Sequence, residues 1–410
     1  MIPDPRFSSI RLAVIKLTNR CNIKCKYCYE DILANGKDMT TEIFQKIVQT
    51  LLASSSESKL SLLLHGGEPT LLSEEWFEEN LEKTHELSCY YKKEVKVDIQ
   101  SNLIDLTDSK IEIFKRFNVN IGGSVDNPNY STEYLRPLST KAYDNYLRLK
   151  NKEVRVGILS TINQSNLDIM GEFCDWLSTS LNEKSFVANV AYSVGNGDSL
   201  ISPKAVDIFN AQKDIINYMI NSDGIFFEHN LSEEIILFFE CYKAQRKRPG
   251  SLCNDMYCGA GSKVLSFTLD GDILPCGRFA WSDSNHYLGN INSRPLISFF
   301  KKKKEQFHKL NSEIWKRCSS CKAKAICNFG CRAFIARSKC IYNIECEPTK
   351  LRFEYYCQIE EKLQKLYEQI CNFKSRPAMS SFDQKLYRLH QTTPPKYHAY
   401  IQKELEGSFS

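Results

Sequence analysis

The 410-residue sequence lacks any long hydrophobic run. No apolar stretch approaches the roughly 20 residues of a membrane span, and no signal-peptide core follows Met1. Net charge is also small, at +5, and the basic runs Lys301 to Lys304 and Arg246 to Arg248 are typical of solvated helix faces. We therefore expect a cytoplasmic protein that binds neither membranes nor nucleic acid.

Cysteine, in contrast, is abundant. The chain has 17 cysteines, together with 42% hydrophobic and 25% charged residues, a balance that is ordinary for globular domains with a full core. The cytosol keeps thiols reduced, so these cysteines argue for metal binding and against disulfides. Thiolates are the usual ligands of iron–sulfur clusters.

Short apolar runs alternate with helical periods from residue 11 to about residue 240. This alternation predicts repeated βα units and a parallel sheet, an α/β fold with too few units for a full eight-fold barrel. Ligands in such folds gather at the carboxyl ends of the strands. The predicted strands are Leu12–Leu17, Leu60–Leu64, Val95–Gln100, Val119–Ser124, Val154–Ser160 and Phe186–Tyr192, and the predicted helices are Thr41–Ala53, Glu74–Leu87, Ser109–Phe117, Lys141–Lys150 and Leu167–Ser178.

Three cysteines follow the first predicted strand, with the spacing C-x3-C-x2-C: Cys21, Cys25 and Cys28. Such a triplet can hold three corners of a cubane [4Fe–4S] cluster and leave the fourth iron open, as catalytic zinc sites leave one position open. A structural zinc site is the alternative, but zinc sites usually show paired Cys-x2-Cys units with four ligands.

This triplet, with the aromatic Tyr27 before its last cysteine, closely resembles the signature of radical S-adenosylmethionine (SAM) enzymes. The resemblance implies that the open iron binds the amino and carboxylate groups of SAM. It also implies that one electron from the cluster cleaves SAM to a 5′-deoxyadenosyl radical. For residues 1–240 it implies a partial (β/α)6 barrel.

A second motif, Gly66-Gly67-Glu68-Pro69, ends the second predicted strand. Glycine permits positive φ and close backbone approach, and a carboxylate can accept a charge-assisted bond from an amine. In radical SAM enzymes this segment holds the amino group of SAM, a role that the resemblance assigns to Glu68. Alone, the motif is a turn.

Polar residues also follow the next strands. The resemblance assigns Ser101, Asn102 and Ser124 to the ribose and carboxylate of SAM, and offers Arg136 as a further candidate for the carboxylate. The alternative is that these residues cap turns.

The C-terminal cysteines resemble a SPASM domain, which we expect over residues 241–360, with a helical extension over 361–410. The resemblance implies two auxiliary [4Fe–4S] clusters, and zinc at Cys318 to Cys331 is the alternative. Cys340 and Cys346 compete for the last position, where Cys357 is preferred because Tyr355 and Tyr356 match the family. The first auxiliary cluster would take Cys253, Cys258, Cys276 and Cys331, and the second Cys318, Cys321, Cys327 and Cys357.

The resemblance is close to sulfatase-maturing enzymes and to maturases of ribosomally made peptides. Sulfatase maturases carry an aspartate base directly after the Pro-Cys pair, whereas this chain has Gly277. Gly277-Arg278 instead resembles crosslinking maturases such as the cyclophane formers. We therefore expect an oxidative carbon–carbon crosslink in a precursor peptide. Formylglycine-type oxidation of a Ser or Cys, thioether formation, epimerisation and a purely electron-transferring role stay open.

The sequence leaves the catalytic base open. Asp126, Glu133 and Asp283 are candidates, each with a structural alternative, and His65 is a candidate for substrate contact. The expected cofactors are three [4Fe–4S] clusters and SAM. The expected partners are a precursor peptide, an electron donor of flavodoxin or ferredoxin type and, as one option, a separate leader-binding protein.

Overall fold

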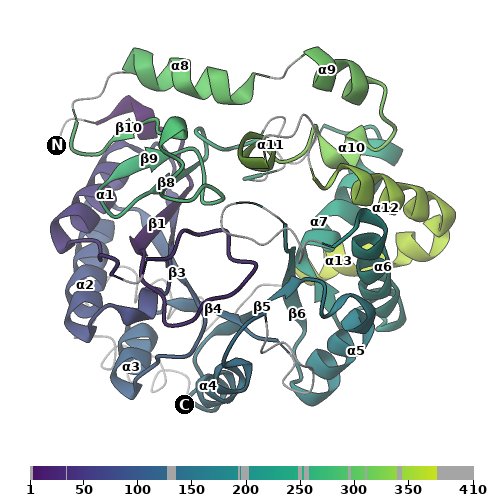
Figure 1. Cartoon of the computed structure of the whole chain (residues 1–410), viewed down its shortest axis with the longest axis horizontal. Helices are drawn as coiled ribbons and strands as arrows, with labels where there is room; N and C mark the ends of the chain where they lie inside the picture. Colours follow the sequence, from purple (N-terminus) through teal and green to yellow (C-terminus); the bar gives the residue numbers. More distant parts are fainter. Residues whose placement is uncertain are drawn as a thin grey trace, which may run out of the picture.

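The computed structural model has one twisted sheet at its centre, with helices outside it and a long N-terminal loop across its inner side (Figure 1). The cysteine triplet and the Gly66–Pro69 motif lie together on that inner side, at the carboxyl ends of the parallel strands. The structure describes residues 3–33, 35–126, 135–192, 194, 203–247, 252–253, 258–293, 297–309, 312–338 and 344–375.

Strands β1 to β7 are parallel and lie side by side in chain order. One set of positions in these strands is wholly buried, as at Ile15, Leu64 and Ile99, whereas in β2 and β3 the positions between are less buried and often polar. The strands are β1 (Leu12–Thr18), β2 (Lys59–Gly66), β3 (Glu94–Ser101), β4 (Asn120–Ser124), β5 (Val156–Ile162), β6 (Ser185–Val190) and β7 (Phe227–Glu228).

Helices follow the strands and cover the outer face of the sheet (Figure 1). Local capping defines where several begin, because Thr40, Ser73 and Thr107 each accept a hydrogen bond from a backbone N–H in the first turn. The helices are α1 (Thr41–Ser54), α2 (Glu74–Tyr91), α3 (Asp108–Arg116), α4 (Ser139–Asn151), α5 (Met170–Asp175), α6 (Ala205–Asn221) and α7 (His229–Leu237).

The cysteine-rich region continues the same sheet. Strand β8 (Val264–Phe267) pairs in parallel with β1, and β9 (Asp272–Leu274) and β10 (Gly289–Asn290) follow in antiparallel order. The sheet therefore runs β10-β9-β8-β1-β2-β3-β4-β5-β6-β7. The sequence did not predict that β1 has a neighbour from the SPASM region on its second edge.

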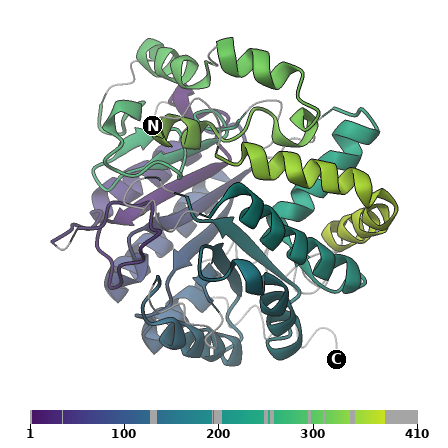
Figure 2. The ribbon, with the colours of Figure 1, turned by 45° about the vertical axis from the view of Figure 1, so that its right-hand side comes forward.

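Six further helices follow in the described residues, and α12 packs along α6 (Figure 2). Arg352 of α12 reaches both α6 and α7, because its guanidinium donates to Gln212 of α6 and forms a buried ion pair with Glu234 of α7 at 2.6 Å. The helices are α8 (Ile297–His308), α9 (Ser312–Ser319), α10 (Lys324–Cys327), α11 (Arg332–Ser338), α12 (Cys346–Gln358) and α13 (Glu360–Ser375).

The predicted α/β fold class is confirmed, and all six predicted strands are present. The two-residue β7 was not predicted, and the predicted helix Leu167–Ser178 is divided into a 3₁₀ turn, α5 and a π-helical turn. The proposed boundary at residue 240 falls inside the π-helical segment Phe238–Lys243, and most of the proposed 361–410 extension lies outside the described residues. No helix in the described ranges is long and apolar enough to cross a membrane.

Candidate functional site

The cysteine triplet lies in the loop between β1 and α1, above the carboxyl ends of the strands. The three thiols are close enough to interact electrostatically with one another. Burial raises the pKa of Cys25 to about 11 and that of Cys28 to about 12, so both thiols are protonated at neutral pH without a metal. Iron binding would therefore release protons from this loop.

The two glycines of the second motif hold the cysteine loop against β2. A side-chain Cβ at Gly67 would lie 2.0 Å from the carbonyl oxygen of Arg20, and Gly66 has a φ of +129°. The backbone N–H of Gly67 donates to the Thr18 carbonyl at 2.7 Å, and that of Glu68 donates to the Arg20 carbonyl at 2.8 Å. The glycines thus allow a backbone contact that places the cysteines at the end of the sheet.

Glu68 is buried, and the chain itself supplies partners for both its carboxylate oxygens. Its Oε1 accepts from the Thr70 backbone at 3.0 Å, the Thr70 hydroxyl at 2.7 Å and the Ser101 hydroxyl at 2.9 Å. Its Oε2 accepts from the Asn102 N–H at 2.6 Å. The carboxylate therefore joins the ends of β2 and β3, and its contact with a SAM amine stays a prediction.

We expect Glu68→Gln to destabilise the fold by about 1–3 kcal/mol, because an amide cannot accept all of these bonds and leaves buried donors unpaired. The apparent melting temperature of the cluster-loaded protein should fall by roughly 2–4 °C for each kcal/mol. Glu82→Gln, at an exposed position of α2, is the matched control and should leave the melting temperature unchanged. Equal melting temperatures for the two variants would contradict the bracing role.

The other polar candidates form a network around the same strand ends. Asn102 Nδ2 donates to Asn22 Oδ1 at 2.7 Å and lies 3.7 Å from Cys21 Sγ. Ser124 accepts from Gln100 Nε2 at 3.1 Å. The structure therefore brings Ser101 and Asn102 directly beside the cysteine loop, whereas Ser124 lies one strand further along.

Two of the three candidate bases have structural partners. Asp283 pairs with Arg337 at 2.8 Å and accepts from the Ala280 N–H at 2.7 Å, so it caps a turn. Asp126 is buried and accepts from the Ser160 hydroxyl at 3.1 Å. Glu133 lies outside the described residues.

Sequence reasoning missed a buried polar cluster formed by Lys16 of β1, Glu30 of the cysteine loop and His65 of β2. Lys16 Nζ contacts both a Glu30 oxygen and the Phe279 carbonyl, and His65 Nδ1 lies 3.6 Å from Glu30 Oε1. Burial, with the charge of Lys16, lowers the pKa of His65 to about 3, so the ring is neutral. A lysine inside the apolar run of β1 was the signal that could have revealed this cluster.

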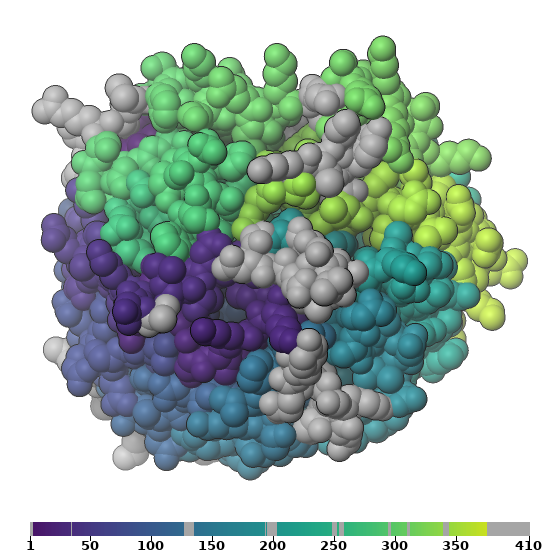
Figure 3. Space-filling model, viewed as in Figure 1, coloured from purple at the N-terminus to yellow at the C-terminus, as the bar shows by residue number. Residues whose placement is uncertain are grey.

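The same cluster adjoins the SPASM region. Tyr29 of the cysteine loop donates its hydroxyl to the Gly277 carbonyl at 2.9 Å, and the ring lies 6.1 Å from that of His65. In the space-filling view the purple N-terminal segment and the green β8–β10 segment adjoin at the surface (Figure 3). Gly277 packs on β1, since a Cβ there would lie 2.9 Å from a methyl group of Val14.

The first predicted auxiliary set is brought together. Cys276 interacts electrostatically with Cys331, Cys258 and Cys253, although these residues come from separate turns and from the start of α11. Burial raises the pKa of Cys258 to about 11 and, more strongly, that of Cys276. Cys253 is exposed, and the other three thiols are at least partly buried. Four neighbouring thiols of this kind suit an iron–sulfur cluster.

The structure separates two candidates for the last position of the second set. Cys318 and Cys327 interact electrostatically with Cys346, whereas Cys357 is exposed beside Lys243 and Glu360. Cys346 and Cys357 lie at opposite ends of α12, roughly 16 Å apart at 1.5 Å per residue, so they cannot serve one cluster interchangeably. Cys346 therefore lies nearer to Cys318 and Cys327 than Cys357 does, the choice of the fourth ligand stays a prediction, and Cys340 lies outside the described residues.

All three cysteine sets are looser than the ligand shell of a single ion. Among the residues that the structure describes, no three His, Cys, Asp or Glu side chains converge closely enough to hold one metal ion. A cubane distributes its cysteine ligands over separate irons and so holds them further apart than one tetrahedral ion does.

Two family models match the chain. The model of the radical SAM superfamily matches residues 15–169, and that of the SPASM iron–sulfur cluster-binding domain matches residues 258–323. The chain is a radical SAM enzyme with a C-terminal SPASM domain. It therefore binds SAM at an iron–sulfur cluster and carries auxiliary iron–sulfur binding in the SPASM domain.

Curated relatives of this radical SAM enzyme include two sulfatase maturases. The Clostridium perfringens cysteine-type anaerobic sulfatase-maturating enzyme is 22% identical, over 85% of this chain and 94% of the relative. The Bacteroides thetaiotaomicron serine-type enzyme is 23% identical, over 76% of this chain and 80% of the relative.

Solved structures show the same fold. The structure of native anSMEcpe with bound AdoMet and the Cp18Cys peptide has a TM-score of 0.71 at 20% identity, covering 88% of this chain and 99% of that one. The Streptococcus suis SuiB structure with its precursor peptide SuiA has a TM-score of 0.58 at 18% identity, covering 83% and 76%.

The site of this radical SAM enzyme fits the carboxylate of SAM at Arg136. Its Nη1 lies 3.9 Å from Cys25 Sγ and 3.5 Å from the Tyr27 hydroxyl, while Nε lies 3.9 Å from Asp126. The buried Nη2 has no hydrogen-bond partner in the described part of the chain. A carboxylate beside the cysteine loop would satisfy this orphaned donor.

Proposed function

We propose that this enzyme is a maturase that oxidises a ribosomally made precursor peptide, with a cyclophane-type carbon–carbon crosslink as the favoured product. Membership of the radical SAM/SPASM class supports the maturase role, and the peptide-bound structures of anSMEcpe and SuiB support a peptide substrate. The wholly electron-transferring role does not agree with this class.

The residue at position 277 is the basis for preferring one reaction over the other. Tyr29 and Gly277 join the cysteine loop to the SPASM segment through a 2.9 Å hydrogen bond, so residue 277 lies beside the cysteine loop. A carboxylate at this position, the base of the sulfatase maturases, is absent. The tight contact of Gly277 with Val14 also leaves no free space for one. This favours a crosslink over formylglycine-type oxidation, which is the second candidate.

We assign three [4Fe–4S] clusters to the chain. Cys21, Cys25 and Cys28 would hold the first, and Arg136 would orient the SAM carboxylate. When bound, the cluster and SAM supply a 5′-deoxyadenosyl radical, which takes a hydrogen atom from the substrate. The auxiliary sets are Cys253, Cys258, Cys276 and Cys331, and Cys318, Cys321, Cys327 and Cys346.

In this proposal, residues beside the cysteine loop would exclude water from the site and hold the peptide. The Lys16–Glu30–His65 cluster borders the cysteine loop on the side of Gly277, and the neutral His65 ring can exchange hydrogen bonds with a peptide without carrying charge. His65 is therefore proposed as a substrate contact. The role of general base stays unassigned, and an electron donor and a separate leader-binding protein are the proposed partners.

An anaerobic turnover tests the function. The reconstituted enzyme, SAM and dithionite would be mixed with any short peptide encoded beside the gene, as the candidate precursor, and the product examined by tandem mass spectrometry. We expect loss of two hydrogens and a stretch between two residues that resists fragmentation. Two hydrogens lost from one serine or cysteine, with normal fragmentation around it, would establish formylglycine-type oxidation instead. Deoxyadenosine with unchanged peptide would contradict this peptide as the substrate.

A further inference from the structure

Residues 297–324, from α8 to the start of α10, hold the positive charge of the chain. This segment has nine Lys and Arg residues against two glutamates, Glu305 and Glu313, a surplus of seven, while the whole chain is at +5. The remainder of the chain is therefore net negative. We call this segment the α8–α10 face.

The face is exposed. Helices α8 and α9 run along the upper rim of the molecule and form its outer surface there (Figures 1 and 3). Lys301 and Lys302 are exposed, and neither forms an ion pair with any residue that the structure describes. Lys303 donates to the Asn285 carbonyl at 3.4 Å. Because these unpaired lysines are gathered on one exposed face, they create a local positive electrostatic field and are more than a solvated helix surface.

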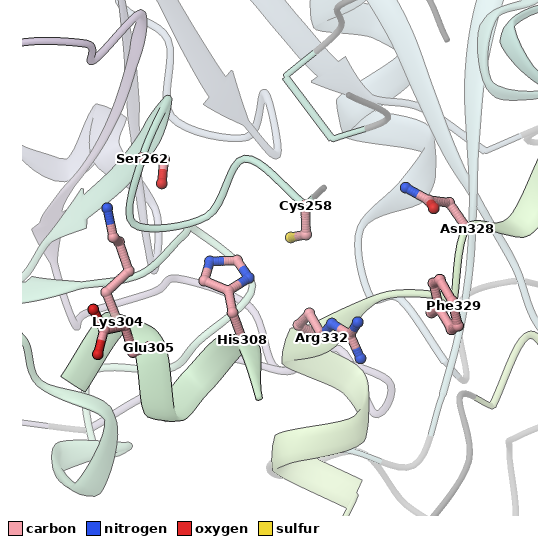
Figure 4. Close-up of a pocket in the computed structure, with 8 residues that line it drawn as sticks. All are labelled: Cys258, Ser262, Lys304, Glu305, His308, Asn328, Phe329 and Arg332. Atoms are coloured by element: carbon pink, nitrogen blue, oxygen red, sulfur yellow. The ribbon is translucent and has the colours of Figure 1, made fainter. Parts of the chain in front are cut away.

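A pocket of roughly 280 Å³ opens beneath this face (Figure 4). Lys304 and His308 line it from α8 and Arg332 from the start of α11, while Cys258 lies in its wall. Cys258 belongs to the first auxiliary cysteine set, so the pocket reaches a residue that would hold the first auxiliary cluster. Arg332 also interacts electrostatically with cysteines of both auxiliary sets.

An aromatic pair joins the α8–α10 face to the pocket, with Trp315 on the face and Phe329 in the pocket lining. The Trp315 side chain is 55% exposed and stacks on Phe329, with ring centroids 5.4 Å apart. Lys324 Nζ lies 5.3 Å from the Phe329 ring centroid. An exposed tryptophan surrounded by cations is typical of a protein interface, where aromatic and basic residues are enriched.

We propose that the α8–α10 face docks an acidic one-electron carrier protein of the ferredoxin or flavodoxin class. The basic charge selects an acidic partner, and the cluster cysteine in the pocket wall selects a redox partner over a peptide or a nucleic acid. The proposal rests on the proposed oxidation. One substrate hydrogen leaves as an atom to the deoxyadenosyl radical and the other as a proton, and the remaining electron reduces the oxidised carrier.

Binding of a purified acidic bacterial ferredoxin to the cluster-loaded full chain tests the proposal. The variant K301E/K302E reverses two exposed charges on α8. K141E/K184E is the matched control, with two exposed lysines on α4 and before β6. We expect the first variant to weaken binding about tenfold or more at low ionic strength, and the control to change it less than about twofold. Carbodiimide crosslinking followed by mass spectrometry should join ferredoxin carboxylates to lysines of residues 297–324.

Equal affinities for the two variants, or crosslinks elsewhere on the chain, would overturn the proposal. So would an acidic precursor peptide or a DNA duplex that loses binding to K301E/K302E while ferredoxin does not. Dithionite-driven turnover separates this result from the proposed function, because it needs no carrier. K301E/K302E should retain dithionite-driven turnover. If the unaltered enzyme shows no such turnover, the peptide function is refuted and the docking result is unaffected.

Discussion

We expect Cys25→Ala to abolish formation of 5′-deoxyadenosine. Cys25 is the central thiol of the triplet, it interacts with Cys21 and Cys28, and Arg136 approaches it to 3.9 Å. Its loss would leave two of the three proposed ligands for the cluster that cleaves SAM, so no radical should form. The measurement is deoxyadenosine by mass spectrometry after anaerobic reduction in the presence of SAM, with the iron content of the same sample.

Cys89→Ala is the control for this experiment. Cys89 lies on α2 beside His85, away from all three cysteine sets, and its replacement should leave both iron content and deoxyadenosine unchanged. The auxiliary clusters should persist in Cys25→Ala, so that iron falls by about one third and does not disappear. Deoxyadenosine at the unaltered rate in Cys25→Ala would contradict the assignment of the first cluster.

Cys346→Ala should cost the protein one auxiliary cluster. Cys346 starts α12 and interacts electrostatically with Cys318 and Cys327, and burial raises the pKa of Cys327 to about 12. Because burial keeps such thiols protonated, they are poor ligands for free metal ions. Together they can still hold an iron–sulfur cluster that binds them as thiolates. We expect about one third of the bound iron to be lost, together with a lower melting temperature, because metal binding contributes to folding.

Cys357→Ala is the matched control, since both residues lie on α12 and both changes remove one thiol. The exposed Cys357 should be dispensable for iron content and stability. Iron content and low-temperature electron paramagnetic resonance spectra of the reduced proteins distinguish the two. Cluster loss in Cys357→Ala, with retention in Cys346→Ala, would restore the original sequence-based assignment.

The sheet and the motif loops could be predicted from the sequence because their determinants are local. Strand β1 is buried almost throughout, and β2 and β3 are buried at every second position, so they show as an apolar run and as alternation, and Gly66 and Gly67 are needed for one backbone contact. The identity of the fold follows from these short segments.

The remaining features depend on tertiary position. Cys346 and Cys357 both fit a cysteine pattern, and only the placement of α12 against α10 separates them. Lys16, Glu30 and His65 come from a strand, a loop and another strand, so no spacing in the sequence relates them. The basic run of α8 can likewise be interpreted as a docking face only once its position beside Cys258 is known.

The pairing of β8 with β1 has a consequence for how the chain is made. Leu12 of β1 leaves the ribosome about 250 residues before its partner on one side, Val264, which is synthesised only after β2 to β7. Until then β1 is an unprotected sheet edge, open to pairing with other chains. Arrival of the cysteine-rich segment closes that edge, so completion of the sheet and assembly of the auxiliary cysteine sets belong to the same late step of folding.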